Sequence, residues 1–251
     1  MLEIVRLLEE CGLGRRIVDY DLAWGAKASI YADAIACSIA RYETPVLIEL
    51  TDDLSKDFDR SLLIVVDHHG PAAGADRPCA LAQIAQLVGP DRHREVWTRR
   101  RALVAANDIG HAAGMRALGA DRDEIRAIRD ADRAAQGVTA ADEAEARRAL
   151  AHPRRIDGLL LVETSAPTSS AVMDFLLPEY DGPGESDILV VTSQNLVFFG
   201  RGDVVQALSF EPGSWFGGAL PEKGYWGIPR PRADKGALVR KIAELLEAPA
   251  R

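Results

Sequence analysis

The feature of this sequence that most constrains its fold is a short apolar run that ends in a cluster of ionisable residues. The run Ser61-Leu62-Leu63-Ile64-Val65-Val66 is followed directly by Asp67-His68-His69. Aliphatic runs of this length, bounded by polar residues, are typical of a buried parallel strand. Ligands of open α/β sheets bind at the carboxyl ends of the strands, so chemistry is expected here. One carboxylate and two imidazoles can hold a divalent ion and orient one another. The simpler alternative is a strand end that is polar without a function.

The first half of the chain alternates between strand and helix patterns. Helical spacing covers residues 2–10, 28–41, 79–88 and 95–107, and strand patterns cover residues 15–19, 45–50 and 61–66. Strands that alternate with helices of this length predict a doubly wound parallel sheet.

The second half of the chain has a different pattern. Residues 121–152 are rich in Asp, Arg, Glu and Ala, which favours solvent-facing helix and a connector between domains. Short strands are expected at 159–162, 188–191, 196–199 and 204–208, and a helix at 235–246. We therefore predict an α/β chain: a doubly wound parallel sheet domain (1–120), a helical connector (121–153) and a smaller α/β domain with a mixed sheet (154–251).

Composition excludes several classes of protein. The chain has 251 residues and a formal net charge of −8, which argues against long nucleic acid as the main partner, because such binding rests on neutralising phosphates. No window approaches the run of about 18 apolar residues that a membrane span requires. The start of the sequence lacks a signal-peptide pattern. Cys11, Cys37 and Cys79 are odd in number and widely spaced, as expected for reduced thiols. These features predict a cytoplasmic protein with no membrane partner.

Acidic and imidazole groups occur at four places in the first predicted domain. They are Asp33 at a helix start, Asp52 with Asp53, Asp67-His68-His69, and Asp108. Neighbouring parallel strands would bring these groups together. A mixed set of oxygen and nitrogen ligands suits Mn²⁺, and Mg²⁺ less well. A bound ion beside a histidine would hydrolyse phosphate esters, since the ion makes the nucleophile and neutralises phosphate charge.

On these residues the chain resembles the DHH phosphoesterase superfamily, which includes exopolyphosphatases, manganese pyrophosphatases, single-strand exonucleases and hydrolases of cyclic dinucleotides or nano-RNA. Asp67-His68-His69 is similar to the signature motif, residues 33–38 to the end of the first motif, and residues 107–111 to the fourth. Asp52 or Asp53 would supply the second motif. The Gly-rich segments within 201–224 resemble the substrate loop of the DHH-associated C-terminal domain.

The resemblance implies a hydrolase acting on phosphoester or phosphoanhydride bonds of a small nucleotide, short oligonucleotide or polyphosphate, with manganese as cofactor. Its implied metal ligands are Asp33, Asp52 or Asp53, His68 and Asp108. Asp67 would orient an imidazole, and His69 would face the scissile phosphate. Its implied substrate-binding residues are His111, Arg201, Gly217, Gly218 and Lys223. Simpler roles compete: Asp108 and His111 as helix caps, Asp52-Asp53 as a turn, and Gly217-Gly218 as a tight turn.

The first motif departs from the family pattern. It normally begins with a His and a further Asp, but Lys27 and Tyr31 stand near those positions. We therefore expect one tight metal position and a weak or empty second one, unless Asp19 or Asp21 substitutes from the preceding loop. A catalytically impaired DHH-fold protein that binds a phosphorylated ligand or a partner protein is the main alternative. A nucleic-acid exonuclease is disfavoured by the acidic charge, and a homodimer is left open.

Overall fold

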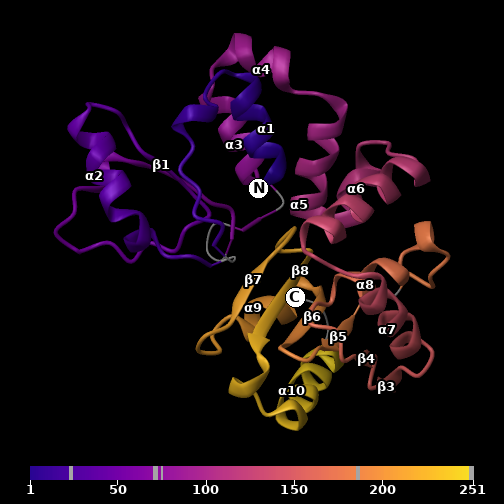
Figure 1. Cartoon of the computed structure of the whole chain (residues 1–251). Coiled ribbons are helices and arrows are strands. Elements are labelled where there is room, and N and C mark those ends of the chain that lie inside the picture. Colours follow the sequence, from indigo (N-terminus) through magenta and orange to yellow (C-terminus); the bar gives the residue numbers. More distant parts are fainter. Residues whose placement is uncertain (23–24, 70–72, 75, 185–186, 249–251) are drawn as a thin grey trace. The chain divides into compact units, whose positions relative to one another are not determined.

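The computed structural model describes residues 1–22, 25–69, 73–74, 76–184 and 187–248. The chain divides into two compact units (Figure 1). Unit 1 comprises Met1–Ala72 and Arg77–Ala105, and unit 2 comprises Ala73–Asp76 and Ala106–Arg251. The architecture is mixed α/β, with a parallel sheet in unit 1 and a mixed sheet in unit 2, as the predicted fold class requires. The predicted boundaries at 120 and 153 stay a prediction.

Unit 1 contains a two-stranded parallel sheet. Strand β1 (Val46–Ile48) pairs with β2 (Ile64–Val66), and Ile48 lies opposite Val66. Leu47 of β1 and Leu63, which precedes β2, pack against Ile35 of helix α2 (Ala32–Ala40) in a small core. The short helix η2 (Ala28–Tyr31) precedes α2. Both strands lie within the runs that the sequence predicted as strands.

Two other helices of unit 1 follow the predicted apolar spacing, whereas residues 90–117 differ from the prediction and end in a helix that continues into unit 2. Helix α1 (Leu2–Glu10) and helix α3 (Ala80–Leu87) form where periodicity predicted them. Helix α4 (Pro90–Val96) and the long helix α5 (Arg99–Ala117) replace the single helix expected at 95–107. Helix α5 is kinked at His111, whose φ is 52° and ψ is −146°. A Cβ at Gly114 would lie 2.3 Å from the Ala106 carbonyl oxygen, so this close approach requires glycine.

The strand predicted at residues 15–19 was wrong. The chain forms the short helix η1 (Gly14–Arg16) there and continues without regular structure. Val18 keeps 50% of its surface exposed, and none of the described strands pairs with this segment. Two apolar residues after two arginines give too little surface to bury, and a strand without a sheet partner is not stable.

Unit 2 is built on a six-stranded sheet with the order β3-β4-β5-β6-β8-β7. The strands are β3 (Arg154–Ile156), β4 (Leu159–Glu163), β5 (Ile188–Val191), β6 (Asn195–Arg201), β7 (Trp215–Gly217) and β8 (Lys223–Pro229). Strands β4 and β5 are parallel, and the other pairs are antiparallel. Three of these strands cover the runs predicted at 159–162, 188–191 and 196–199.

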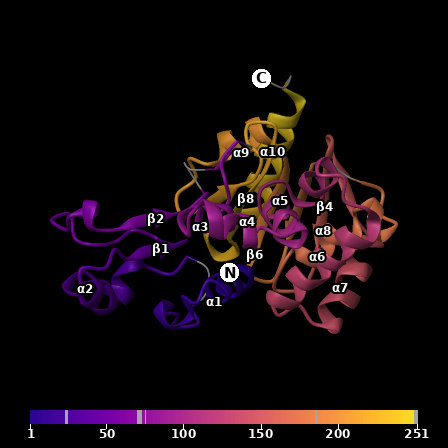
Figure 2. The ribbon, with the colours of Figure 1, turned by 90° about the horizontal axis from the view of Figure 1, so that it is seen from above.

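Helices cover both faces of this sheet (Figure 1, Figure 2). Alternate side chains of a strand point to opposite faces. Leu159 and Leu161 pack with α9 (Gly202–Leu208) and α10 (Lys235–Glu247), whereas Leu160 and Val162 pack with α7 (Ala140–Leu150) and α8 (Ser170–Phe175). A strand buried on both faces reads as a continuous apolar run, which explains why β4 could be recognised from the sequence.

The strand predicted at residues 204–208 was also wrong, because this segment is helix α9. Val204, Val205 and Leu208 are spaced to share one face of a helix, and all three are buried in the same core. A run of five residues with β-branched side chains fits either structure, and packing against β6 and β8 decided it.

The charged segment 121–152 is helical, as predicted, and it belongs to unit 2. Helix α6 (Arg122–Ala135) begins with a capping box between Asp121 and Glu124. Ile125 and Ile128 of α6 are buried, together with Arg129 and Arg133. The described part of the chain contains no helix that is both long and apolar enough to span a membrane.

Candidate metal site in unit 1

Three side chains with metal-ligating atoms meet at the carboxyl end of the parallel strands of unit 1. Glu49 follows β1 directly, and His68 and His69 follow β2 after Asp67. The Glu49 N–H donates to the Val66 carbonyl oxygen at 2.9 Å, so the two chain segments leave the ladder side by side. One ligand atom each from Glu49, His68 and His69 lies within 4.8 Å of the other two. The strand register therefore creates the cluster.

The two histidines of the cluster differ in burial. His68 is buried, with 6% of its surface exposed, and its Nδ1 lies 3.4 Å from Glu49 Oε1. His69 keeps 18% of its side chain exposed. The ring centroids of the two histidines are 4.2 Å apart, with the rings tilted by 42°. His69 is thus the more accessible of the two imidazoles.

Asp67 holds the histidine pair in place. Its Oδ1 accepts the backbone N–H groups of His68 at 2.7 Å and His69 at 3.0 Å, and lies 3.0 Å from His69 Nδ1. Burial opposes the charge on Asp67, but the hydrogen bonds from His69 and the backbone outweigh it, so the pKa of Asp67 is below its usual value. The side chain of Gln83, on α3, donates to the Asp67 carbonyl oxygen at 2.9 Å and so ties the backbone of Asp67 to α3. That Asp67 orients an imidazole for catalysis stays a prediction.

Glu49 adopts a strained backbone conformation, with a φ of 53°. A residue other than glycine in this region costs on the order of 1–3 kcal/mol, and such strain clusters at functional sites. Glu49 is not among the site residues predicted from the sequence. The sequence signal that could have identified Glu49 is a carboxylate directly after the apolar residues Val46–Ile48. Only the register of β1 with β2 places that carboxylate beside His68.

The donor set of this cluster fits a divalent transition metal. Two imidazole nitrogens with one carboxylate oxygen suit Mn²⁺, Fe²⁺ or Zn²⁺ better than Mg²⁺, which prefers oxygen ligands. The contact of His69 Nδ1 with Asp67 leaves Nε2 as the ring atom that faces away from the carboxylate. Carboxylate–histidine pairs of this kind commonly orient a histidine toward a metal.

The other predicted acidic ligands of unit 1 lie outside this cluster. Asp52 accepts two hydrogen bonds from Arg60, at 3.0 and 2.9 Å, and these bonds lower the pKa of Asp52. Asp53 accepts from the backbone N–H and the hydroxyl of Ser29, at 2.8 and 2.7 Å, and the pKa of Asp53 is lowered by these bonds. Asp33 lies exposed in the first turn of α2. Their role as metal ligands stays a prediction.

Two further predicted residues lie on helix α5 in unit 2. Asp108 is exposed. His111, at the kink, has its Nε2 3.4 Å from Oδ1 of the buried Asp174. Burial and the nearby Arg129 guanidinium lower the pKa of His111, although Asp174 opposes this change. Within unit 2, His111 therefore contacts a network of charged groups.

The predicted substrate-binding residues near the end of the chain serve the fold of unit 2. Arg201 donates to Asp203 at 3.0 and 2.6 Å and to the carbonyl oxygens of Leu246 and Ala248 at 3.0 and 3.1 Å. Its guanidinium thus joins the start of α9 to the end of α10. Lys223 is exposed at the first position of β8. Binding of substrate by these residues stays a prediction.

Gly217 and Gly218 allow β7 to lie close to β8. A Cβ on Gly217 would be 2.6 Å from the Tyr225 hydroxyl oxygen, and one on Gly218 would be 2.8 Å from the Gly224 Cα. Gly218 also has a φ of 102°, a conformation that favours glycine. Strand packing by itself accounts for both glycines, and their predicted contact with phosphate stays a prediction.

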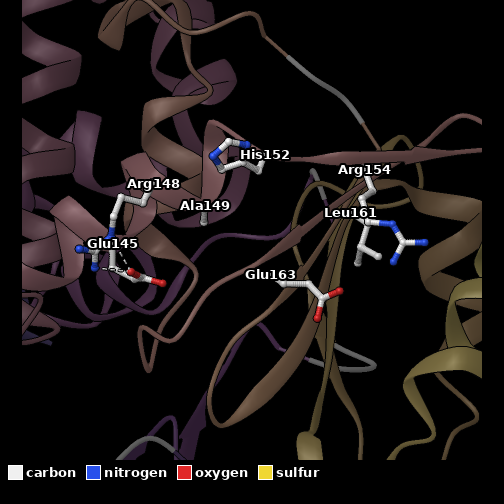
Figure 3. A pocket seen from close by; sticks show the side chains of 7 residues that line it. All are labelled: Glu145, Arg148, Ala149, His152, Arg154, Leu161 and Glu163. Atoms are coloured by element: carbon white, nitrogen blue, oxygen red, sulfur yellow. Dashed lines mark hydrogen bonds and ion pairs between the residues drawn. The ribbon is translucent and has the colours of Figure 1, made fainter.

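A shallow hollow of unit 2 lies between the end of α7 and the strands β3 and β4 (Figure 3). Its charged groups are of both signs. Glu145 pairs with Arg148, and Glu163 binds Lys235 at 2.8 Å. His152 and Arg154 complete the polar lining. Because the carboxylates already have cationic partners, this hollow offers no ligand set comparable to the cluster of unit 1.

Comparison with known proteins gives limited help. No protein-family model and no curated protein matches this sequence. A solved structure, a pGpG-specific phosphodiesterase, PggH from Vibrio cholerae, is similar over 98% of this chain and 95% of its own chain. The sequence identity is 14% and the TM-score is 0.34. A similarity this low does not show the function of this chain.

Proposed function

We propose that this chain is a metal-dependent phosphoesterase whose ion is held by Glu49, His68 and His69. The observation that carries the proposal is the convergence of these three side chains at the carboxyl ends of β1 and β2. A bound divalent ion would neutralise phosphate charge and supply a nucleophile near neutral pH. Manganese is the proposed metal, because the set mixes imidazole and carboxylate ligands.

The protein's own groups have defined tasks in this proposal. Asp67, kept ionised by its lowered pKa, accepts a hydrogen bond from His69 Nδ1 and so fixes the tautomer of that ring. The backbone bonds from His68 and His69 hold the Asp67 carboxylate in position. Glu49 adds a negative charge beside His68, which favours binding of a cation.

The proposed substrate is a small phosphorylated molecule: a nucleotide, a short oligonucleotide or a polyphosphate. The net charge of −8 disfavours a long polyanion, because long nucleic acid needs many cationic contacts. The sequence resemblance to DHH phosphoesterases supports the same class of bond. The cytoplasmic location and the homodimer stay predictions, as do the roles of His111, Arg201 and Lys223.

A second candidate is a protein of the same fold that binds a phosphorylated ligand without hydrolysing it. Asp52 is held by Arg60, Asp53 is held by Ser29, and Lys27 Nζ lies 4.0 Å from Asp53. These contacts engage two of the acids that the family resemblance implies as ligands of the same ion as His68. A protein with one ion and no hydrolysis would fit this arrangement.

The deciding experiment measures metal content and hydrolysis together. Protein purified with Mn²⁺ and dialysed should hold about one ion per chain and should hydrolyse bis(4-nitrophenyl) phosphate. His68→Ala should lose both properties, whereas Asp91→Asn, a change at an exposed position of α4, should keep both. Metal binding without hydrolysis of this ester or of short oligonucleotides would favour the second candidate. Absence of metal binding would refute the phosphoesterase proposal.

His69 has two proposed roles that this experiment separates. His69→Ala should reduce turnover by about 10²-fold, the range for loss of a positioned acid or base. If His69 is a ligand, metal content falls as well. If His69 faces the scissile phosphate, as the family resemblance implies, metal content remains near that of the unchanged protein.

A further inference from the structure

A hollow of about 400 Å³ in unit 2 is lined by helices α6, α7 and α8 and by the short helix η5 (Pro178–Tyr180). Three arginines contribute to its lining, Arg126, Arg133 and Arg147, together with the rings of Phe175 and Tyr180. Two carboxylates, Asp130 and Glu143, also lie there. The volume is in the range of small-molecule sites.

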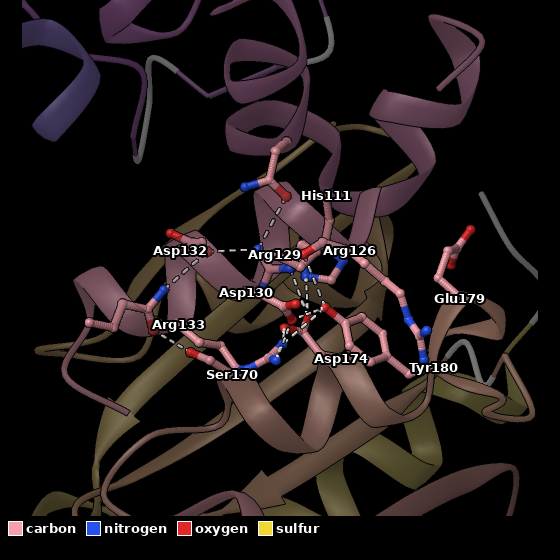
Figure 4. A network of polar contacts seen from close by, with 12 residues as sticks. His111, Arg126, Arg129, Asp130, Asp132, Arg133, Ser170, Asp174, Glu179 and Tyr180 are labelled. Atoms are coloured by element: carbon pink, nitrogen blue, oxygen red, sulfur yellow. Dashed lines mark hydrogen bonds and ion pairs between the residues drawn. The ribbon is translucent and has the colours of Figure 1, made fainter. Parts of the chain in front are cut away.

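Arg133 forms ion pairs with both carboxylates of this hollow. It donates to Glu143 at 3.0 Å, to Asp130 at 2.6 Å and to the buried Asp174. Asp130 also accepts the Tyr180 hydroxyl at 2.6 Å (Figure 4). Both acids of the hollow are therefore engaged with Arg133 and Tyr180.

The other two arginines stack on aromatic rings. The Cζ of Arg147 lies 3.7 Å from the centre of the Phe175 ring, and the Cζ of Arg126 lies 5.1 Å from the centre of the Tyr180 ring. Figure 4 shows Arg126 beside Tyr180. Stacking uses the flat face of a guanidinium and leaves the N–H groups at its edge free to donate.

The edge donors of these two arginines have no carboxylate partner within the described part of the chain. The Nε of Arg126 is buried and lacks a hydrogen-bond acceptor there. A buried N–H without an acceptor is costly, and such a group in a native protein indicates an acceptor supplied from outside the chain. The fork of a guanidinium matches two oxygens of a carboxylate or of a phosphate group.

We propose that Arg126 and Arg147 bind a small oxyanion in this hollow, with phosphate or carboxylate oxygens accepting from the guanidinium edges. The contacts with the aromatic rings restrict the two side chains before an anion binds, so little side-chain freedom is lost on binding. The site lies within unit 2, uses none of the residues of the metal cluster, and does not depend on the proposed phosphoesterase activity.

The test is calorimetric titration of the full chain with phosphate, pyrophosphate and citrate in separate runs. The protein is freed of metal with EDTA and then dialysed into buffer without it, so that a metal ion at Glu49, His68 and His69 contributes no binding and the chelator's own carboxylates do not compete. Arg126→Met and Arg147→Met keep an unbranched side chain for the ring contact but remove the donors. Each should weaken binding about tenfold or more, as expected for loss of a charge-assisted hydrogen bond. Far-UV circular dichroism and thermal unfolding check that both variants are folded.

Arg148→Met is the matched control, since Arg148 neighbours Arg147 on α7 but pairs with Glu145. It should bind as the unchanged protein does. Preference for phosphate and pyrophosphate identifies a phosphate site, and preference for citrate identifies a carboxylate site. Absence of binding by the unchanged protein at 10 mM of all three anions, or equal weakening by Arg148→Met, would overturn the proposal. Arg126→Lys keeps the charge without the planar fork, and binding equal to that of the unchanged protein would also contradict the stated geometry.

Discussion

The two units bury ionisable groups in opposite ways. In unit 2, Asp174 is fully buried, and its two oxygens meet Arg129 at 2.7 Å and Arg133 (Figure 4). In unit 1, Glu49, His68 and His69 bring together a carboxylate and two imidazoles, which all carry lone pairs for a cation. The network of unit 2 balances charge within the chain and is structural. The cluster of unit 1 is suited to bind a cation from outside the chain.

The pKa directions agree with this contrast. Burial opposes the charge on Asp174, but the hydrogen bond from His111 and the charge of Arg129 outweigh it and lower the pKa of Asp174. Burial and the bond to Asp130 raise the pKa of Tyr180 to about 12. The carboxylate therefore stays ionised and the phenol stays neutral at physiological pH, so the network keeps one charge state.

The largest effect should follow from breaking the balance in unit 2. Asp174→Asn leaves Arg129 and Arg133 without their buried counter-charge, and loss of one partner of a buried ion pair costs about 3–5 kcal/mol. The free energy of unfolding of unit 2 should fall by that amount in urea denaturation followed by circular dichroism. Asp181→Asn, in an exposed ion pair of unit 2, should change it by less than about 1 kcal/mol. A loss below 1 kcal/mol for Asp174→Asn would show that the network does not stabilise the unit.

The next effect concerns the metal and separates Glu49 from the acids that the sequence selected. Glu49→Gln should weaken Mn²⁺ binding by about 10²-fold. Loss of a group that only supports a metal ligand typically costs about 10–100-fold, and loss of a ligand itself should cost at least as much. Asp52→Asn should change it less than about threefold, because Asp52 is engaged by Arg60. Titration of metal-free protein with Mn²⁺ measures both constants. If Asp52→Asn weakens Mn²⁺ binding more than Glu49→Gln does, the metal site lies at the loop that contains Asp52 and not at the strand ends.

A smaller effect is expected at Arg201. Arg201→Ala removes the bonds to Asp203 and to the end of α10, and should lower the free energy of unfolding by about 1–2 kcal/mol. Lys223→Ala, at an exposed position, should lower it by less than about 0.5 kcal/mol. Chemical denaturation of both variants checks this. If Lys223→Ala weakens binding of the phosphoester while stability is kept, the predicted substrate contact gains support.

The smallest effect is the pH dependence of the contribution that Asp67 makes to the free energy of unfolding. The pKa of Asp67 is lowered in the folded chain from the ordinary value of 3.8, so its contribution to stability is fully present above that value. This contribution is lost as the pH falls through the lower folded pKa. The stability difference between the unchanged chain and Asp67→Asn should thus be constant above about pH 5 and shrink below about pH 4. Urea denaturation in EDTA from pH 6 to pH 3 measures it, and a difference that grows on acidification would contradict the sign.

The sequence by itself determined the elements with strong local patterns. Continuous apolar runs identified β4 and β5, because strands buried on both faces tolerate no polar residue. Helical spacing identified α1 and α10. The position of Asp67, His68 and His69 after β2 was likewise evident, since a strand end is a local feature.

Only the tertiary structure decided what depends on distant neighbours. The short runs at 15–19 and 204–208 contain β-branched residues, but none of the described strands pairs with either run. The first run is irregular after a short helix, and the second is helix α9, which packs on the sheet. Glu49 joins the cluster because Ile48 pairs with Val66, a register that no local pattern encodes. Arg129 and Arg133, which read as solvent-facing charges, are buried because Asp174, about 40 residues later in the chain, pairs with them. Pairing between residues far apart in sequence is a property of packing, and packing is fixed by the whole chain at once.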